Sequence, residues 1–402
     1  MVSRIKNKKI AFFMLPLLTQ GAGAEKYFIE AAKNLADQGV PSEVITLNEK
    51  SFRTFARIVH ILTHGNFFGK IDISGRESEA NVVKRLGRAK WRKISWKNLG
   101  TVLSKYDVIY SKNELVDLFT LKKIGYGKLP PVVVGVHTPI YYPITDTTLS
   151  KIHNLLYLGY LYKFLLKGVS CIHLSNKFTK ELVDRHFKIK SSLIYYPFSS
   201  KLILASAKEN RYKTEFPKNR INIVFVSRLA DQKGIDILGR VVDNLAQDPE
   251  ITSKIKINIF GSGDEKNENI VKNLAKKYSF VKYFGHVENK LIPNILSRQD
   301  LFITTAKWET LPFNVLESQA VGLPVIAFDI PGPNDIIRNG KTGILVKTKD
   351  EGGFLKAIKD FVSSQHLFAK KDIIGHIDRK FNPEKIYSDL TKLFENTIKN
   401  SK

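Results

Sequence analysis

The chain has a single cysteine, Cys171, among its 402 residues, and no long uninterrupted apolar run. One cysteine excludes an intramolecular disulfide framework, argues against a cysteine-based metal site and is typical of a reducing compartment. The longest apolar run, 155–166, contains Gly159 and Lys163 and is shorter than the roughly 20 residues of a membrane span. We interpret it as a core helix, with an apolar surface as the alternative. We expect a soluble or peripheral protein.

The N-terminus also lacks a convincing signal peptide. Basic residues precede the apolar run 10–15, which could pass for such a segment. However, Pro16 and the polar pair Thr19 and Gln20 interrupt it, and no clear cleavage site follows. We therefore predict that the run is the first β-strand.

Acidic residues are scarce: 38 Asp and Glu face 64 Lys and Arg, which gives a formal net charge of +26. Residues 1–200 carry 31 basic and 14 acidic side chains, and residues 201–402 carry 33 and 24. Such an excess attracts nucleic acid, an anionic membrane surface or phosphorylated substrates. The excess belongs mainly to the first half of the chain.

Short β-branched or aromatic runs alternate with longer stretches of helical periodicity, which predicts parallel strands joined by crossover helices. In the first half we predict a helix over 25–38 and strands at 10–15, 42–46, 108–110, 132–136, 169–174 and 192–195. In the second half we predict helices near 234–244, 268–278, 291–296 and 313–321, and strands at 221–226, 255–260, 281–284, 301–304, 324–328 and 343–346.

The polar stretch 207–220 divides these two α/β patterns, and we interpret it as a linker. We predict a first domain over 1–206, a second over 221–382, and a closing amphipathic helix over 383–402. Ligands of doubly wound sheets bind beyond the carboxyl ends of the strands, so the functional residues should lie there.

Two carboxylates, Glu309 and Glu317, lie eight positions apart around a predicted helix start. Thr310 is a plausible N-cap and Pro312 suits the first helical turn. Backbone N–H groups of residues 313–315 would then be free to bind a phosphate, with one carboxylate on each side for sugar hydroxyls. The alternative is a solvated helix residue and an acid that complements the helix dipole.

Two cations, Arg228 and Lys233, follow the strand predicted at 221–226. Arginine makes bidentate contacts to phosphate oxygens and lysine acts as a point charge, so both suit a diphosphate. Gly261 and Gly263 follow the next strand, where glycine permits close approach of the backbone. Surface cations and a tight turn are the alternative interpretations.

Four motifs in a fixed order resemble those of a known family. They are R-L-x-x-x-K-G at 228–234, G-x-G at 261–263, E-x7-E at 309–317 and A-x-G-x-P-V-I-A at 320–327. They are similar to the nucleotide-sugar-dependent retaining glycosyltransferases of family 4. The resemblance is clear over about 220–346 and weaker over 1–200. It implies the GT-B fold, an α/β architecture of two Rossmann-like doubly wound domains facing a central cleft, with the C-terminal helix closing back toward the first domain.

The resemblance implies a role for each matched residue. Arg228 and Lys233 would bind the donor pyrophosphate and stabilise the leaving nucleotide, Glu317 would hold the ribose hydroxyls, and Glu309 would contact the transferred sugar. The other donor-binding residues would be Gly261, Phe313, Asn314 and Val315.

Two features of the first half agree with the same family. Gly21 and Gly23 follow the first strand without forming a dinucleotide fingerprint, because Lys26 occupies the third glycine position. They are similar to the glycine-rich loop that approaches the donor phosphates. His137 follows an apolar strand and would contact the sugar near its anomeric or C6 side.

The sequence departs from the family pattern in two places. It has Gly332-Pro-Asn-Asp335 where a glycine pair and glutamate are frequent, and Phe313-Asn314 where Phe-Gly or Leu-Pro is common. The segment 330–337 looks like that of members that use UDP-hexoses or UDP-N-acetylhexosamines. The resemblance thus implies transfer of such a sugar from a nucleotide sugar to a hydroxyl acceptor, on a lipid-linked or cell-surface glycan precursor.

The family mechanism is front-face substitution with retention, in which a donor phosphate oxygen accepts the proton of the acceptor. Catalysis would consist mainly of positioning and of electrostatic stabilisation of the departing diphosphate. No Asp-x-Asp metal motif is present, and we expect neither a metal nor another cofactor. The cations at 228 and 233 would take the place of the metal.

Residues 84–97 hold seven cations, no acid, and the two tryptophans Trp91 and Trp96. We predict that this segment binds an anionic membrane surface on the cytoplasmic face of the cell membrane, with a solvated loop as the alternative. Two other functions stay open. A nucleic-acid-binding α/β protein would fit the charge but leave the ordered motifs unexplained, and another GT-B enzyme such as a sugar-nucleotide epimerase would fit the fold.

Overall fold

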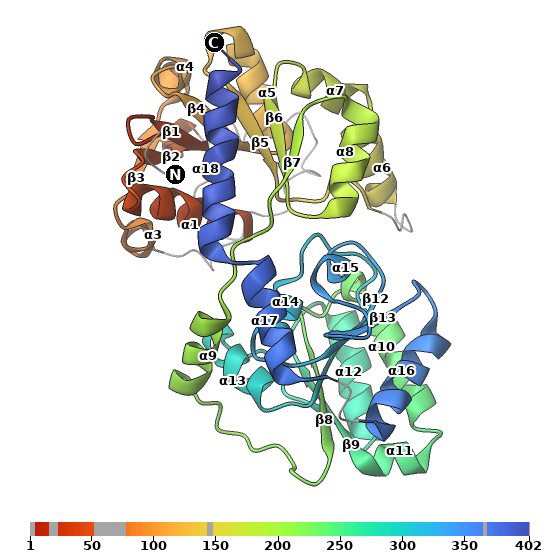
Figure 1. Cartoon of the computed structure of the whole chain (residues 1–402). Coiled ribbons are helices and arrows are strands. Elements are labelled where there is room, and N and C mark those ends of the chain that lie inside the picture. The colour runs from red at the N-terminus through yellow and green to blue at the C-terminus, as the bar shows by residue number, and fades with distance from the viewer. Residues whose placement is uncertain (1–4, 16–22, 52–77, 143–147, 365–367, 402) are drawn as a thin grey trace. The chain divides into compact units, whose positions relative to one another are not determined.

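The computed structural model describes residues 5–15, 23–51, 78–142, 148–364 and 368–401. The chain divides into two compact units (Figure 1). Unit 1 comprises residues 1–196 and 384–402, and unit 2 comprises residues 197–383.

Unit 1 is built on a seven-stranded parallel sheet of order β3-β2-β1-β4-β5-β6-β7. Its strands are β1 (Ile10–Phe13), β2 (Ser42–Leu47), β3 (Lys90–Ile94), β4 (Val108–Lys112), β5 (Val132–Val136), β6 (Cys171–Leu174) and β7 (Ser191–Leu193). Its helices are α1 (Gly23–Asp37), α3 (Glu79–Leu86), α4 (Leu99–Leu103), α5 (Leu115–Ile124), α6 (Thr148–Leu158), α7 (Tyr160–Leu166), α8 (Lys177–Phe187) and α18 (Pro383–Lys399), with single 3-10 turns η3 (Trp96–Asn98) and η4 (Tyr126–Lys128).

Unit 2 has a six-stranded parallel sheet of order β10-β9-β8-β11-β12-β13. Its strands are β8 (Ile221–Val226), β9 (Ile255–Phe260), β10 (Val281–Tyr283), β11 (Leu301–Thr304), β12 (Val325–Phe328) and β13 (Gly343–Val346). Its helices are α9 (Ser200–Glu209), α10 (Ile235–Leu245), α11 (Pro249–Lys254), α12 (Glu265–Lys277), α13 (Ile292–Ser297), α14 (Phe313–Ala320), α15 (Pro333–Ile336), α16 (Glu351–Ser363) and α17 (Lys370–Lys380), with 3-10 turns η5 (Asp231–Lys233) and η6 (Asn289–Leu291).

Both sheets are doubly wound, because the chain reverses its direction of travel between β1 and β4 and between β8 and β11. All strands are parallel, so each sheet is covered on both faces and its central strands are buried along nearly their whole length. In β1, for example, all four residues Ile10–Phe13 are fully buried. The predicted α/β class and the two doubly wound sheets are therefore confirmed.

The C-terminal helix α18 returns to unit 1, as predicted (Figure 1). Phe394 on this helix packs edge-on against Phe12 of β1 and Tyr110 of β4, with ring centroids 6.3 and 5.7 Å apart. Phe28 of α1 joins the same cluster at 5.8 Å from Phe12. The last helix thus completes the core on one face of the first sheet.

The expected boundary at residue 206 and the expected linker over 207–220 differ from the observed division. Helix α9 belongs to unit 2, where it packs against α13 and α14. The stretch that follows is also docked there: Asn294 donates to the carbonyl oxygen of Ala207 at 2.8 Å and accepts from the backbone N–H of Tyr212 at 3.0 Å. Polar composition indicated a linker, but these polar groups are paired with unit 2.

Strand β3 was not predicted, since its sequence Lys-Trp-Arg-Lys-Ile carries three cations and does not show an apolar face. It pairs in parallel with β2 at the edge of the first sheet, where side chains can extend into solvent. No helix within the described ranges is long and apolar enough to cross a membrane.

Candidate functional site

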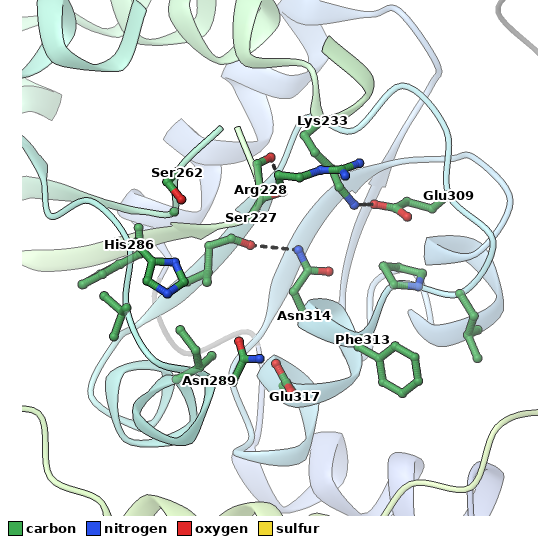
Figure 2. A pocket seen from close by; sticks show the side chains of 17 residues that line it. Ser227, Arg228, Lys233, Ser262, His286, Asn289, Glu309, Phe313, Asn314 and Glu317 are labelled. Atoms are coloured by element: carbon green, nitrogen blue, oxygen red, sulfur yellow. Dashed lines mark hydrogen bonds and ion pairs between the residues drawn. The ribbon is translucent and has the colours of Figure 1, made fainter. Parts of the chain in front are cut away.

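A cavity of about 600 Å³ opens at the carboxyl ends of the strands of unit 2 (Figure 2). Arg228 and Lys233 reach it from the segment after β8, and Glu317 reaches it from α14. The polar side chains that line it are Ser227, Arg228, Lys233, Ser262, His286, Asn289, Glu309, Asn314 and Glu317. The sequence-predicted residues Gly261 and Phe313 also line it.

Lys233 and Glu309 form an ion pair at the cavity, although 76 positions separate them in the chain. Both side chains are largely buried, with 18% of the lysine and 10% of the glutamate exposed. Lys233 is held in place by its backbone, since its carbonyl oxygen accepts a bond from Thr305 Oγ1 at 3.1 Å. A largely buried charge pair of this kind fixes the cation at the cavity wall.

Glycine is required where η5 leads into α10. Gly234 has φ +67°, and a Cβ there would lie 2.0 Å from the carbonyl oxygen of Thr305 at the end of β11. Gly261 likewise has φ +134°, and its Cβ would lie 1.8 Å from the carbonyl oxygen of Ser227. These glycines let the segments after β8 and β9 approach their neighbours closely, which shapes the floor of the cavity.

The N-cap of helix α14 lies two residues later than the capping pattern suggested. Pro312, in extended conformation, is the N-cap, and no side chain caps the helix. Thr310 is therefore not the cap, because the chain between it and Phe313 is not helical. Asn314 donates from Nδ2 to the carbonyl oxygen of Val226 at 2.9 Å, which ties the start of the helix to the end of β8.

One of the backbone N–H groups expected to be free is occupied. The N–H of Val315 donates to Oδ1 of Asn314 at 2.9 Å. Val315 is fully buried and does not line the cavity, whereas Phe313 is 42% exposed and does. The prediction that backbone N–H groups of residues 313–315 bind a phosphate therefore now concerns only those of Phe313 and Asn314, the first two residues of the helix.

Several residues that line the cavity were missed by sequence reasoning. His286, Val287 and Asn289 follow β10, a strand of only three residues, and Ile292 begins α13. The available signal was their position just after the predicted strand 281–284, since a ligand of a doubly wound sheet binds beyond such ends. No motif distinguishes them.

Polar residues also gather within and just after the central strands of unit 1, where His137 lies. His173 Nε2 is 2.8 Å from the carbonyl oxygen of Ile194, so it must donate, and its Nδ1 accepts from Tyr110 Oη at 2.6 Å. Tyr110 Oη therefore accepts from His137 Nε2 at 2.8 Å, and His137 Nδ1 accepts from Tyr196 Oη, also at 2.8 Å. The four side chains form a one-way chain of hydrogen bonds.

Both histidines in this hydrogen-bonded chain, His137 and His173, are neutral. Burial, then the neighbouring His173 and Lys112, hold the pKa of His137 well below its ordinary value. Burial lowers the pKa of His173 to about 4, against the opposing bond to Ile194. Both ring nitrogens of His137 are in use, so a sugar hydroxyl would have to replace Tyr110 or Tyr196. The predicted sugar contact stays a prediction.

A buried charged cluster lies beside this chain at the end of β4. Lys112 Nζ donates to Glu25 Oε1 of α1 at 3.0 Å, and both side chains are at most 6% exposed. Burial lowers the pKa of Lys112, but Glu25, Asp117 and Glu114 outweigh that effect and leave it raised. Burial raises the pKa of Asp117 to about 7, against the pull of Lys112 and of the Leu15 N–H, 2.8 Å away.

The glycine-rich loop is described only in part. Gly21 lies outside the described residues, and Gly23 is the first residue of α1. In the predicted membrane segment 84–97, Trp91 Nε1 donates to Thr46 Oγ1 at 2.9 Å and Trp96 packs against the core of unit 1. Arg92 pairs with Glu43 at 3.0 Å, and Lys93 pairs with Glu79.

Residues 206–375 match the family model described as glycosyl transferases group 1. This region, less than half of the chain, is therefore a domain of this family. The matched region lies entirely in unit 2 and contains every residue that lines the cavity, so this glycosyltransferase carries its family signature on the unit with the open site. As an enzyme it is a hexosyltransferase.

Two curated relatives and one solved structure are similar to this chain over most of its length. The chain is 28% identical over 257 residues to an uncharacterized 41.2 kDa protein in the cps region of Klebsiella pneumoniae, covering 61% of this chain and 67% of that one. It is 24% identical over 310 residues to UDP-Gal:alpha-D-GlcNAc-diphosphoundecaprenol alpha-1,3-galactosyltransferase of Escherichia coli, covering 74% and 77%. The crystal structure of Anabaena HepE in complex with UDP matches with a TM-score of 0.69 at 16% identity, and the match covers 96% of this chain and 100% of that one. This likeness identifies the fold as GT-B.

Proposed function

We propose that this glycosyltransferase moves a hexose or N-acetylhexosamine from a UDP-sugar to a hydroxyl of a lipid-linked or cell-envelope glycan precursor, with retention of configuration. The observation that carries the proposal is the cavity of unit 2, where two cations and two carboxylates face one space. A nucleotide sugar has a diphosphate for the cations and ribose and sugar hydroxyls for the carboxylates.

The residues suggest a division of labour within the cavity. Arg228 and Lys233 would neutralise the diphosphate as it leaves, which is where charge develops in the transition state. Phosphate oxygens would compete with Glu309 for Lys233, and the released carboxylate of Glu309 would be available to sugar hydroxyls. Glu317, one turn into α14, would accept the two ribose hydroxyls.

The proposed donor and acceptor are supported by two relatives. HepE was crystallised with UDP, and the name of the E. coli relative specifies a UDP-sugar donor and a diphosphoundecaprenol acceptor. The first supports a uridine nucleotide, and the second a lipid-linked acceptor. We propose that no metal is needed, because the two cations would provide the positive charge that a metal otherwise supplies.

A thermal-shift screen of nucleotide sugars tests the donor. One UDP-sugar should raise the melting temperature by mass action, and Glu317→Ala should abolish the shift while keeping the melting temperature of the free protein. Lys254→Ala is the matched control, because Lys254 pairs with Glu250 on the surface, away from the cavity. Stabilisation by RNA or DNA but by no nucleotide sugar would refute the proposal and favour the nucleic-acid alternative.

Transfer and its stereochemistry need separate assays. With the identified donor, the anomeric proton coupling of the product should show the configuration of the donor, and chelator should leave turnover unchanged. An inverted product would refute retention, and loss of turnover in chelator that Mg²⁺ restores would refute metal independence. Interconversion of the free UDP-sugar without any acceptor would instead identify an epimerase.

A further inference from the structure

Helices α6 and α7 of unit 1 expose an unusual number of large apolar side chains. Leu155 is 73% exposed, Tyr160 91% and Phe164 56%, and Ile152 and Leu161 are also exposed. The opposite faces of the helices are buried through Tyr157, Tyr162, Leu165 and Leu166. The interpretation of 155–166 as a core helix therefore describes only one face, and the other face is an apolar surface.

The exposed residues follow helical spacing and alternate with lysines. On α6, Lys151, Ile152 and Leu155 share a face, and on α7, Tyr160, Lys163 and Phe164 do so. Between the helices Gly159 adopts an extended conformation, with ψ −176°, and a Cβ there would lie 2.3 Å from the carbonyl oxygen of Leu155. The segment is thus a bent helical pair with a buried apolar inner face and an outer face of exposed apolar side chains and lysines.

Helix α5 supports and extends this surface. Lys122 Nζ donates to the carbonyl oxygen of Lys167 at 2.8 Å and lies 4.6 Å from the ring centroid of Phe164. Phe119, three residues before Lys122 on α5, is 58% exposed. We call the exposed set the α5–α7 surface; it comprises Phe119, Lys151, Ile152, Leu155, Tyr160, Leu161, Lys163, Phe164 and Lys167.

The charged side chains along this stretch of the sequence are almost all lysines. Between Leu118 and Lys180 the sequence has eight lysines and a single acid, Asp146. Among the described residues, no ion pair involves Lys151, Lys163 or Lys167, and all three are exposed. Asp117 on α5 is fully buried and Glu114 is directed to Lys112. Exposed lysines therefore accompany the exposed apolar side chains on both α6 and α7.

We propose that the α5–α7 surface docks this protein on an anionic lipid bilayer, with the apolar side chains in the interfacial region and the lysines at the lipid phosphates. Exposed apolar side chains interspersed with lysines fit the boundary between acyl chains and head groups. A second copy of the chain fits poorly, because it would bring the two sets of lysines together. Nucleic acid would pair with the lysines but leave Ile152, Leu155 and Leu161 without a partner.

The apolar side chains of the α5–α7 surface are exposed, whereas the tryptophans of segment 84–97 are not free to insert into a bilayer. There the tryptophans are held by Thr46 and by the core, and cations are paired with Glu43 and Glu79. That segment can contribute charge, but its aromatic side chains are not available for insertion. The inference does not depend on the proposed sugar transfer, since it rests on unit 1 alone.

Co-sedimentation of the full chain with vesicles tests the docking. The protein should bind vesicles that contain phosphatidylglycerol and bind pure phosphatidylcholine at least tenfold more weakly, with binding that decreases as salt increases. Leu155→Ser with Phe164→Ser should lower the partition coefficient about tenfold or more. Replacing Lys151, Lys163 and Lys167 with Gln should lower it about a hundredfold, at about fivefold for each lysine.

Two control variants test whether the loss of vesicle binding is specific to the α5–α7 surface. Val83→Ser with Leu202→Ser removes exposed apolar residues elsewhere, at 56% and 70% exposure, and should leave binding unchanged. Replacing Lys84, Lys90 and Lys97 with Gln removes the same charge from segment 84–97 and should weaken binding much less. Melting temperatures of all variants should match that of the parent, because each change is at an exposed position.

Insertion itself is measured with a polarity-sensitive dye at Leu155→Cys, since the native Cys171 is buried and will not label. Its emission should shift to the blue on anionic vesicles, whereas a dye at Lys84→Cys should not shift. Equal binding by the Leu155/Phe164 variant and its parent would overturn the proposal. So would a concentration-dependent dimer in sedimentation velocity that the same variant abolishes, because the occupant would then be a second copy.

Discussion

The two units place polar side chains at equivalent points of their sheets and use them in opposite ways. In unit 2, Arg228, Lys233 and Glu317 line an open cavity of about 600 Å³. In unit 1, the polar side chains instead pair among themselves. Tyr196, His137, Tyr110 and His173 form one chain of hydrogen bonds. Lys112 and Glu25 form a separate ion pair. A position at the carboxyl end of a central strand thus predicts a polar cluster, but exposure decides whether that cluster can bind a ligand.

The comparison predicts the largest effect in the open cluster. Lys233→Ala should lower kcat about 10²–10³-fold, because it removes charge stabilisation from the departing diphosphate. It should leave the fold intact, which circular dichroism and the melting temperature will show. Lys254→Ala, which removes an equal charge from the surface, should retain parental turnover. Near-normal turnover of Lys233→Ala would contradict the assigned role of this lysine.

In the closed cluster the corresponding change should affect stability. Lys112→Met leaves Glu25 buried without its partner and should lower the free energy of unfolding by about 3–5 kcal/mol. Urea denaturation measures the loss. The double variant Lys112→Met with Glu25→Gln should recover part of it, since no buried charge is then left unpaired. A loss below about 1 kcal/mol in the single variant would show that the pair contributes little.

The raised pKa of Asp117 predicts a dependence of stability on pH. Because this pKa is about 7 in the folded state and near 3.9 in the unfolded chain, the folded state binds the proton more tightly between these values. The contribution of Asp117 to stability therefore falls as pH rises from about 4 through 7. Between pH 5 and 8 the parent should lose about 3 kcal/mol relative to Asp117→Asn. Parallel stability curves for the two proteins would contradict this.

The smallest effect is expected at the end of the hydrogen-bonded chain. Tyr196→Phe removes the donor to His137 Nδ1 and should cost about 1 kcal/mol of stability, because a buried acceptor loses its partner. If His137 serves only the fold, the KM for the donor will not change. A change in KM with unchanged stability would instead show that His137 Nδ1 contacts the substrate. The polar cluster of unit 1 would then be accessible to a ligand.

The sequence was most informative where local patterns decide the structure. All six strands of unit 2 were predicted, because short β-branched runs between turns are a local signal. Strand β3 was missed, since an edge strand can carry cations on its exposed positions. The cap of α14 was misplaced by two residues because Pro312 is compatible with either the N-cap or the first turn.

The site was predictable only as far as its residues belong to contiguous motifs. Arg228, Lys233, Glu309 and Glu317 were found in this way and line one cavity. The pairing of Lys233 with Glu309 and the contribution of His286 and Asn289 depend on how β8, β10 and β11 are placed in the sheet. The Tyr–His chain of unit 1 likewise joins residues 27 to 63 positions apart, and no local pattern indicates it.

The return of α18 to unit 1 has a consequence for synthesis on the ribosome. Phe12 and Tyr110 emerge early, but Phe394, which covers them, is made only after the whole of unit 2. Unit 2 is continuous in the chain and can fold as soon as it has emerged, whereas the first sheet must wait with an uncovered aromatic face. The nascent chain thus carries a partly open N-terminal half throughout elongation, and it is in this interval that chaperones would be needed.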